Sequence, residues 1–476
     1  MEQLPDLTKL TEAEKDQLIL EQATLIQLLM HKIKQLEERL SKNSGNSSKP
    51  PSSDGFNKPD PKSRRNKNKQ KKKVGGQKGH PGTTLKRAEN PDVITDHDPV
   101  CCWFCSCSLS NANRLDYEGR QVYDLPALDF KITEHRAYKK SCGNCGVITK
   151  ADFPSDVTQS VQYGAKAKGL MVYMHQYQLL PFDRNREFFS DVFNQNISVA
   201  TIISASEKSY VNLEVSENHI KQQLINGKLL HADETGFRVN KSLFWMHVAS
   251  TSKLTFYASH KKRGGEAMNE IDLLTKFNGI LVHDHLKSYF QYAGQHSLCN
   301  AHHLRELTFV QENYKHKWAE KIEKLLINIK HAVESHYEKT GDALPDKKLK
   351  RYWNRYVNIL HEGSSDECPR NHGDGEKKGR VKQTTARNLL ERLRKFDQCV
   401  LAFMYDPTIP FDNNQAERDI RMMKVQQKIS GCFRTADGIK RFCRIRGYIS
   451  TAKKQSVSVL GALQRAMKGQ AILFNA

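Results

Sequence analysis

The chain has 476 residues, a formal net charge of +22 and an isoelectric point of about 9.4. This length allows more than one domain with a sizeable core, and the basic excess favours a polyanionic partner such as DNA. No apolar run approaches the roughly 20 residues that a membrane span requires, and the first residues are acidic and polar, unlike a secretory signal peptide. We therefore expect a cytoplasmic protein with reduced cysteines, whose close cysteine pairs bind metal.

Residues 1–45 show the seven-residue repeat of a coiled coil. Apolar side chains occupy positions spaced as a and d over about three heptads: Ile19, Ile26, Leu29, Ile33, Leu36 and Leu40. Gln22 is a polar d position that weakens this seam. We expect a leucine-zipper-like helix through which the protein forms homo-oligomers. The alternative is an amphipathic helix that packs on its own domain.

Residues 46–95 lack the apolar side chains that folding requires, so we expect a disordered linker there. Between Lys62 and Lys73 the chain carries eight basic residues and no acidic one. Such a tract binds the DNA backbone by releasing counterions, which makes Lys71, Lys72 and Lys73 candidates for DNA contact. The alternative is a solvated basic tract.

Two Cys-x-x-Cys pairs lie within residues 96–150, for which we expect a small zinc-binding domain. The pairs are Cys102 with Cys105 and Cys142 with Cys145. Two such pairs in one chain are typical of a tetrahedral site that holds one structural Zn²⁺ through four thiolates. Cys101 and Cys107 leave the first pairing open, although Cys107 with Cys105 would make a poorer knuckle.

Residues 155–225 are predicted to be helical. One helix covers Pro181–Phe193, residues 194–197 form a turn, and Ser198 caps a second helix that runs to about Leu213. This pair is compatible with a helix-turn-helix that reads DNA. A plain helical hairpin explains the pattern equally well.

Residues 226–455 have the pattern of an α/β domain. Three strands, a helix and two further strands follow one another: Lys228–Asp233, Phe244–Ser250, Lys253–Ser259, Gly265–Phe277, Gly279–Asp284 and Ser297–Cys299. This is the element order of an RNase H-like domain with a mixed five-stranded sheet. Polar helical sequence at about 303–405 is expected to be an insertion, and residues 456–476 a C-terminal helix. The expected fold is thus an α/β catalytic core with a helical insertion, a small zinc-binding domain and an N-terminal coiled-coil helix.

Three acidic residues in separate segments are the candidate catalytic residues and Mg²⁺ ligands. Asp233 lies on the first strand, Asp284 at the end of the fourth, and Glu417 in the polar start of a helix. The first and fourth strands are neighbours in such a sheet, so the two aspartates would meet at one edge. Carboxylates assembled in this way commonly hold two Mg²⁺ ions, or Mn²⁺ in their place, for phosphoryl transfer on nucleic acid.

Neighbouring residues offer alternatives to this set. Glu234 is adjacent to Asp233, and strand alternation allows only one of the two to point at the site. Glu306 follows the fifth strand too early to be the third acid. We prefer Glu417 because Lys424 lies about two helical turns further on, on nearly the same face, where its ammonium group would hold a phosphate.

Other polar residues near these acids have less specific patterns. Arg418 and Arg421 are candidates for DNA contact, although solvated charges are the commoner explanation. Cys299 with His302 or His303 offers two or three ligands for a second metal site. Without a fourth ligand, we favour a packing role for these residues at the strand-to-helix junction.

The chain also contains several distinctive motifs. They are Asn-Ser-Ser-Lys-Pro-Pro-Ser-Ser-Asp at 46–54, Gly-Gly-Gln-Lys-Gly-His-Pro-Gly at 75–82, the two cysteine pairs, His231-Ala-Asp-Glu-Thr235, Cys299-Asn-Ala-His302 and Asp412-Asn-Asn-Gln-Ala-Glu-Arg-Asp-Ile-Arg421. Across nearly its full length, the chain resembles bacterial insertion-sequence transposases of the IS66 family. The last motif is the most specific. The first cysteine pair departs from the family, because Trp103 and Ser106 stand where Pro and Gly are usual.

The resemblance implies a DDE transposase that binds terminal inverted repeats and works with small accessory proteins of the same element, in association with the bacterial nucleoid. In an RNase H-like site, Asp233 would contact two Mg²⁺ ions ~4 Å apart, and Asp284 and Glu417 would each favour one. One ion would activate water and later the 3′-OH of the element end, and the other would stabilise the leaving oxygen. Two other functions stay open: a non-catalytic, zinc-containing DNA-binding protein, and a metal-dependent nuclease that cuts without joining.

Overall fold

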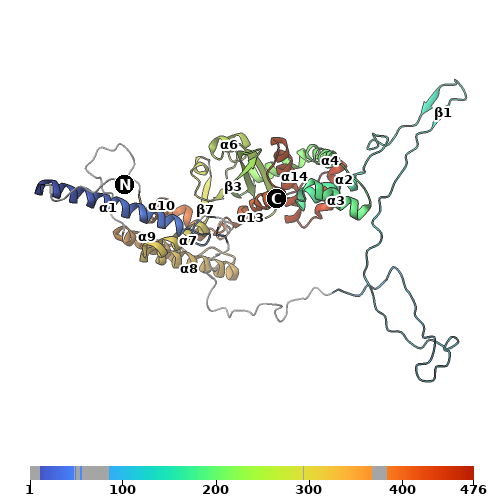
Figure 1. Cartoon of the computed structure of the whole chain (residues 1–476), viewed down its shortest axis with the longest axis horizontal. Coiled ribbons are helices and arrows are strands. Elements are labelled where there is room, and N and C mark those ends of the chain that lie inside the picture. Colours follow the sequence, from blue (N-terminus) through green and yellow to red (C-terminus); the bar gives the residue numbers. More distant parts are fainter. Residues whose placement is uncertain (1–10, 48, 50–53, 56–84, 293, 367–382) are drawn as a thin grey trace.

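The computed structural model describes residues 11–47, 49, 54–55, 85–292, 294–366 and 383–476 (Figure 1). The tract with Lys71, Lys72 and Lys73 and most of the segment 46–95 lie outside these residues. None of the described helices is long and apolar enough to cross a membrane.

A mixed five-stranded sheet carries two of the three candidate acids. Its strands are β3 (Leu229–Val239), β4 (Ser242–Ser250), β5 (Thr255–His260), β6 (Ile280–His283) and β7 (Gln295–Leu298). Their order is β5-β4-β3-β6-β7, in which β3, β4 and β5 are antiparallel and β6 and β7 run parallel to β3. The predicted mixed five-stranded sheet is confirmed, and the first and fourth of its strands, β3 and β6, are neighbours.

Strand β3 is longer than the sequence predicts. The apolar run predicts a strand that ends at Asp233, whereas β3 continues to Val239 and pairs with β4 from His231 onward. A turn of two residues with positive φ, Asn240 (42°) and Lys241 (69°), joins the two strands. Such turns match the twist of a β-hairpin, so pairing with β4 extends the strand through its polar residues. Asp233 therefore lies inside a strand and not at its end.

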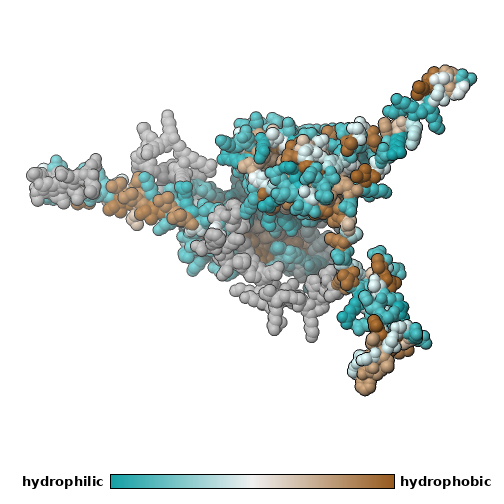
Figure 2. All heavy atoms as spheres, turned by 45° about the vertical axis from the view of Figure 1, so that its right-hand side comes forward, coloured by the Kyte–Doolittle hydropathy of each residue, from teal (hydrophilic) through white to brown (hydrophobic). Residues whose placement is uncertain are grey.

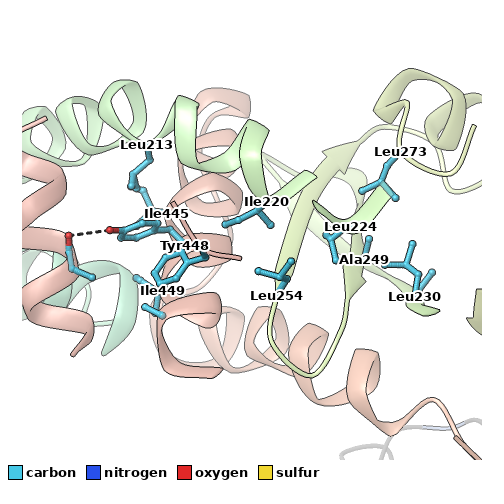
Figure 3. Close-up of a cluster of buried hydrophobic side chains, with 14 of the residues drawn as sticks. Leu213, Ile220, Leu224, Leu230, Ala249, Leu254, Leu273, Ile445, Tyr448 and Ile449 are labelled. Atoms are coloured by element: carbon cyan, nitrogen blue, oxygen red, sulfur yellow. Dashed lines mark hydrogen bonds between the residues drawn. The ribbon is translucent and has the colours of Figure 1, made fainter. Parts of the chain in front are cut away.

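The residues of β3 alternate between two hydrophobic cores. The helices around the sheet are α5 (Glu214–Ile225), α6 (Gly265–Ile271), α13 (Asn414–Ser430) and α14 (Ala436–Lys454). Leu230 and Ala232 pack in the core that α5, α6 and α14 cover, and Figure 3 shows Leu230 in it. Phe237 and Val239 point to the opposite face, which α13 covers. Asp233 lies four residues before Phe237 on the same strand, so its side chain starts on the same face, the one that α13 covers.

The predicted helix at Gly265–Phe277 is shorter in the structure. Helix α6 ends at Ile271, where Asp272 adopts a left-handed conformation with a φ of 50°. Three apolar residues after the helix, Leu273, Leu274 and Phe277, are not helical and are buried in the core that α5, α6 and α14 cover. Their apolar spacing continues the helical pattern in the sequence although the helix itself has ended.

A group of helices with its own core lies between β7 and α13 in the chain. It comprises α7 (Asn300–Tyr314), α8 (Lys317–Thr340), α9 (Asp346–Asp366), α10 (Thr385–Lys395), α11 (Asp397–Val400) and α12 (Ala402–Tyr405). Trp318 and Tyr356 are buried in this core. These helices occupy the segment for which the sequence predicts an insertion at about 303–405.

Helices that precede and follow residues 226–455 in the chain pack together. They are α2 (Ala165–Val172), the π-helical η3 (Tyr173–Tyr177), α3 (Phe182–Phe193), α4 (Val199–Asn212) and α15 (Val459–Met467). Ser198 caps α4, as predicted, by accepting a hydrogen bond from the backbone N–H of Thr201 (3.1 Å). The side chain of Asn212 donates to the carbonyl of Ala466 (2.8 Å), which ties α4 to α15. DNA reading by the α3–α4 pair stays a prediction.

The N-terminal helix α1 (Glu12–Leu40) projects away from the sheet (Figure 1). Its C-terminal end contacts α7, where the hydroxyl of Tyr314 donates to Glu38 (2.7 Å). The residues of the predicted seam are exposed, from 47% for Leu29 to 84% for Leu40, and Figure 2 shows apolar side chains along this arm. The helix is present, and its pairing with a second helix stays a prediction.

Candidate active site

Asp233 and Asp284 meet where β3 and β6 run side by side. His231 lies opposite Val282 in this parallel pair, so the same register brings Asp233 level with Asp284 two residues later. One carboxylate oxygen from each of Asp233, Glu234 and Asp284 lies within 4.8 Å of the others. The meeting of the two aspartates at one edge of the sheet agrees with the prediction from strand order.

Glu234 also belongs to this cluster. Arg263 donates to its Oε1 through Nε (2.9 Å) and Nη2 (2.7 Å), and the hydroxyl of Tyr289 donates to its Oε2 (2.6 Å). The guanidinium of Arg263 lies over the ring of Trp245, 4.9 Å from its centre. The side chain of Glu234 is fully buried. These partners on the face opposite α13 commit the Glu234 carboxylate to an ion pair.

Strand alternation predicts that only one of Asp233 and Glu234 reaches the site. This prediction is wrong, because carboxylate oxygens of both residues lie close to Asp284. The Asp233 carboxylate turns along the strand and accepts a hydrogen bond from the backbone N–H of Glu234 (2.8 Å). An oxygen of each acid thereby comes within 4.8 Å of the other, although the two side chains leave the strand on opposite faces. The two acids differ in their partners, since Glu234 is paired with Arg263 and accepts a hydrogen bond from Tyr289.

Glu417 lies in the first turn of α13, and three side chains of another segment converge on its Oε1. This atom is 3.6 Å from Nδ1 of His302, 3.9 Å from Sγ of Cys299 and 3.9 Å from Nη2 of Arg305. All three come from the junction of β7 with α7 or from the first turns of α7. The start of α13 therefore packs against the start of α7.

The three predicted acids lie in one region, with Glu417 further from the two aspartates than they are from each other. No group of ligand atoms within 4.8 Å contains all three in the described part of the chain. The negative charge of Glu417 nevertheless raises the pKa of Asp233, and that of Asp284 raises the pKa of Glu417. The rival acid Glu306 instead forms an ion pair with Arg392 of α10.

Burial and mutual repulsion raise the pKa of all three carboxyl groups. Burial, followed by the charges of Glu234 and Asp284, raises the pKa of Asp233 well above its ordinary value. Burial and Glu234 raise the pKa of Asp284 to about 6, although Arg263 opposes them. Burial also raises the pKa of Glu417. Crowded carboxyl groups of this kind are stabilised in their charged form by a cation placed among them.

Asn413 is a positioning residue for which the sequence alone predicts no role. It is almost fully buried (1% exposed) and immediately precedes α13. Its amide nitrogen donates to the carbonyl of Ala232 (2.8 Å), its amide oxygen lies 2.8 Å from Nδ1 of His231, and its backbone N–H donates to Sγ of Cys299 (3.1 Å). One residue thus joins β3, α7 and α13. The only indication of this role in the sequence is that Asn413 belongs to the Asp412-Asn-Asn motif.

The predicted DNA-contact residues on α13 have different surroundings. The ammonium group of Lys424 contacts the carbonyl of Gly236 on β3, so it lies along the same strand as Asp233. Arg418 is exposed and donates to Gln415 (3.0 Å), and Arg421 is exposed. Lys424 therefore already has a backbone partner, while the two arginines face solvent.

Comparison with known families matches residues 160–441 to the family described as "Transposase IS66 family". This match covers more than half of the chain and includes the sheet, both aspartates and Glu417. The chain belongs to the IS66 transposase family. Residues 2–86 match a family of unknown function, DUF6444. The comparison with curated proteins finds no significant match. The predicted family resemblance is confirmed, and with it a transposase role.

Outside the matched region of this IS66 transposase, the two Cys-x-x-Cys segments share one backbone turn. In each, the N–H of the first cysteine donates to the carbonyl five residues later, at 2.8 Å for Cys102 and 2.9 Å for Cys142. The residue four positions after that cysteine has a positive φ, 59° for Ser106 and 72° for Gly146. The equivalence favours the Cys102-x-x-Cys105 pairing over the alternatives that the sequence leaves open.

The two turns lie apart in the structure. The second turn connects β1 (Lys139–Ser141) with β2 (Ile148–Lys150), near the tip of an arm (Figure 1). Across the described residues, the four thiols do not form a group within 4.8 Å of one another. One Zn²⁺ held by Cys102, Cys105, Cys142 and Cys145 stays a prediction.

A basic groove lies between α8 and α9 of the helical insertion. Its volume is about 730 Å³, and its lining includes six cationic side chains: Lys321, Lys324, Lys347, Lys350, Arg351 and Arg355. Glu362 is the acidic residue of the lining and pairs with Lys321 (2.6 Å). No sequence pattern marks this surface, because the cations come from two helices and only the packing of α8 on α9 brings them together.

Proposed function

We propose that this IS66-family transposase is a DDE enzyme that binds the terminal inverted repeats of an insertion sequence and catalyses Mg²⁺-dependent strand cleavage and strand transfer. The observation that carries the proposal is the meeting of Asp233 and Asp284 on neighbouring parallel strands, with Glu417 brought near them by α13. The strand order, three antiparallel strands followed by two parallel ones, is that of an RNase H-like sheet and supports the same conclusion.

The donor atoms at the sheet edge fit Mg²⁺. This ion prefers carboxylate oxygens and keeps positions for water and phosphate, and the raised pKa values of the carboxyl groups reflect a concentration of negative charge. Asp233, Asp284 and Glu417 would hold two ions, with Mn²⁺ as a substitute. Bound Mg²⁺ would supply Lewis-acid stabilisation of charge on the phosphoryl group and on the attacking and leaving oxygens.

The surrounding residues orient these acids. Asn413 fixes the start of α13 against β3 and so sets the distance of Glu417 from Asp233. Burial and the charge of Glu234 raise the pKa of Asp284 to about 6, and Arg263, which pairs with Glu234, partly offsets this rise. The chain's own role is therefore to deliver and hold three charged oxygen ligands at the edge of a rigid sheet.

Several cationic surfaces support DNA as the partner. Arg418 and Arg421 lie exposed on the helix that carries Glu417, and the groove between α8 and α9 carries six cations. Such surfaces bind the phosphate backbone without reading sequence. We also propose self-association through the apolar seam of α1, one structural Zn²⁺ at the two cysteine turns, and accessory proteins of the same element as partners.

A strand-transfer assay with Asp233→Asn tests the proposal. The substrate is duplex DNA that carries the ends of the element, incubated with target DNA in Mg²⁺. Wild type is expected to cleave and join, and Asp233→Asn to lose both reactions while still binding end DNA, because the substitution removes a charge but keeps the side-chain shape. Asp342→Asn, at an exposed loop position, is the matched control and should remain active.

The same assay separates the two other candidate functions. Cleavage without joined product would favour a nuclease that only cuts. End binding without cleavage in wild type, with accessory proteins of the element also present, would favour a non-catalytic DNA-binding protein. Equal activity in wild type and Asp233→Asn would show that the aspartate cluster is not the catalytic centre.

A further inference from the structure

Cys299, His302 and Glu417 form a second cluster of metal-ligating atoms beside the carboxylates. Sγ, a ring nitrogen and a carboxylate oxygen of these residues all lie within 4.8 Å of one another. Two of the separations are shorter, since Oε1 of Glu417 is 3.6 Å from Nδ1 of His302 and 3.9 Å from Sγ of Cys299. The cluster thus combines sulfur, nitrogen and oxygen donors, unlike the all-oxygen set of the two aspartates.

These separations suit a tetrahedral ion. Zn²⁺ binds nitrogen and oxygen at about 2.0 Å and sulfur at about 2.3 Å, which places an oxygen of a tetrahedron roughly 3.3 Å from a nitrogen and roughly 3.5 Å from a sulfur. The observed contacts, 3.6 Å from oxygen to nitrogen and 3.9 Å from oxygen to sulfur, are slightly longer than these separations. Small side-chain movements would therefore complete the geometry and leave a fourth position for water or a substrate oxygen.

The backbone explains why the three donors converge. Cys299 precedes the first residue of α7, and His302 follows three residues later, so both side chains sit at the N-terminal end of that helix. Glu417 occupies the first turn of α13. The hydrogen bond from the backbone N–H of Asn413 to Sγ of Cys299 (3.1 Å) holds the two helix starts together.

A packing role explains Cys299 but not His302. Cys299 is buried (1% exposed) and its sulfur accepts from Asn413, as a structural thiol would. Nδ1 of His302 is buried and has no hydrogen-bond partner within the described part of the chain. A buried ring nitrogen without a hydrogen-bond partner calls for an explanation, and an imidazole nitrogen is a common metal ligand.

We propose that Cys299, His302 and Glu417 form a binding site for a thiophilic divalent cation of the Zn²⁺ class. Binding converts the Cys299 thiol to a thiolate and releases its proton to solvent, so that uptake strengthens as pH rises. Arg305, whose Nη2 lies 3.9 Å from Oε1 of Glu417, shares this oxygen and opposes the ion by its charge. Mg²⁺ does not replace the ion here, because magnesium has little affinity for sulfur and nitrogen donors.

A consequence for catalysis follows, and it rests on the proposed function. Glu417 is both the third carboxylate of the proposed Mg²⁺ site and a ligand of this second site. An ion held by Cys299 and His302 draws the Glu417 carboxylate toward α7 and away from the aspartates. Zinc therefore inhibits Mg²⁺-dependent cleavage by competing for one carboxylate and not by displacing Mg²⁺ from the aspartates.

Zinc content measures the site without any activity assay. Full-length wild type, Cys299→Ser and His302→Gln are loaded with Zn²⁺ alone, desalted, and analysed for zinc per chain. Cys443→Ser, which changes another buried cysteine, on α14, that does not belong to the cluster, is the matched control. Wild type and the control are expected to hold one more zinc per chain than Cys299→Ser and His302→Gln, whatever the cysteine turns bind. Circular dichroism verifies that each variant is folded.

Cleavage of end DNA in Mg²⁺, with and without added Zn²⁺, then tests the proposed inhibition. The rate of each protein with zinc is compared with its own rate without zinc. Zinc should inhibit wild type and Cys443→Ser and spare Cys299→Ser and His302→Gln. Equal zinc content in all four folded proteins overturns the site. If the zinc content differs as expected but added Zn²⁺ does not change the rate of cleavage, the binding site is supported and the proposed inhibition is overturned. Wild type that never cleaves in Mg²⁺ contradicts the proposed function and leaves the zinc count unaffected.

Discussion

The amide oxygen of Asn413 lies 2.8 Å from Nδ1 of His231, and this contact joins the start of α13 to strand β3. Burial lowers the pKa of His231, so the ring is neutral and donates a hydrogen bond through Nδ1. The other end of the Asn413 amide donates to the carbonyl of Ala232 (2.8 Å). Because both ends of the amide are used, the helix that carries Glu417 has one position against the strand that carries Asp233.

Asn413→Ala should impair catalysis more than Asn414→Ala. The first change removes two buried hydrogen bonds and leaves the Ala232 carbonyl without its partner, which costs about 1–3 kcal/mol of the free energy of unfolding. It also frees the start of α13, so Glu417 loses its position. Asn414 is exposed at the first residue of the same helix, and its replacement should change little. Urea unfolding and end cleavage in Mg²⁺ check both variants; equal effects at the two positions would contradict the positioning role.

Tyr289→Phe should destabilise the protein more than Tyr292→Phe. The hydroxyl of Tyr289 is buried and donates to the Glu234 carboxylate (2.6 Å), and a hydrogen bond to a charged group contributes about 1.5–3 kcal/mol. The hydroxyl of Tyr292 donates to the neutral Asn269 side chain (2.9 Å), which contributes about 0.5–1.5 kcal/mol. Denaturant midpoints of the two variants measure the difference. A larger loss for Tyr292→Phe would contradict this ranking of the two hydrogen bonds.

Charge reversal in the basic groove should weaken DNA binding and reduce its salt dependence. Replacing Lys347, Lys350 and Arg351 by Glu removes three cations from the lining. For each cation that no longer neutralises a phosphate, the slope of log affinity against log salt becomes shallower by about 0.9. Binding is measured by fluorescence anisotropy on duplex DNA at several salt concentrations. The control replaces three exposed lysines outside the groove, Lys208, Lys440 and Lys468, by Glu. The same weakening in both triple variants would mean that overall charge, and not the groove, binds DNA.

His247 should make the folded state sensitive to acid. Burial lowers its pKa to about 4, below an unfolded value of about 6.5. Between these two values the unfolded chain binds more protons, so the contribution to stability is complete above pH ~6.5 and decreases as the pH falls, by roughly 2 kcal/mol at pH 5. Urea unfolding at pH 7 and pH 5 should show a smaller difference for His247→Gln than for wild type. An unchanged difference would place the acid sensitivity in other groups.

Ser106→Gly should strengthen the first cysteine turn, and Gly146→Ala should weaken the second. Both positions have positive φ, where a side chain costs roughly 1–2 kcal/mol relative to glycine. If the turns hold one Zn²⁺ together, Ser106→Gly slows zinc removal by a chelator and Gly146→Ala accelerates it. Release followed with a colorimetric zinc indicator checks both changes. Opposite or absent effects would separate the turns from zinc binding.

Local patterns were sufficient to predict much of the fold. The strands and their order follow from short apolar runs between turns. Ser198 marks the start of α4 because its side chain bonds a backbone N–H only three residues further on. Asp233 and Asp284 are predictable as neighbours because strand order alone decides which strands pair. The two cysteine turns are likewise local, since each is closed by hydrogen bonds within six residues.

Long-range packing decided the rest. The length of β3 depends on its pairing with β4, which carries polar residues into the sheet against their local preference. The partners of Glu234 come from a loop and a short helix that no spacing connects with β3.

The sequence by itself determined the family, the mixed sheet and the pairing of two aspartates, because these depend on motifs and on the order of elements. Only the tertiary structure decided that Glu417 lies beside Cys299 and His302, more than 100 residues earlier in the chain. The physical reason is that α7 and α13 start at the same edge of the sheet and are held there by Asn413, whose buried hydrogen bonds exist only once all three segments have packed.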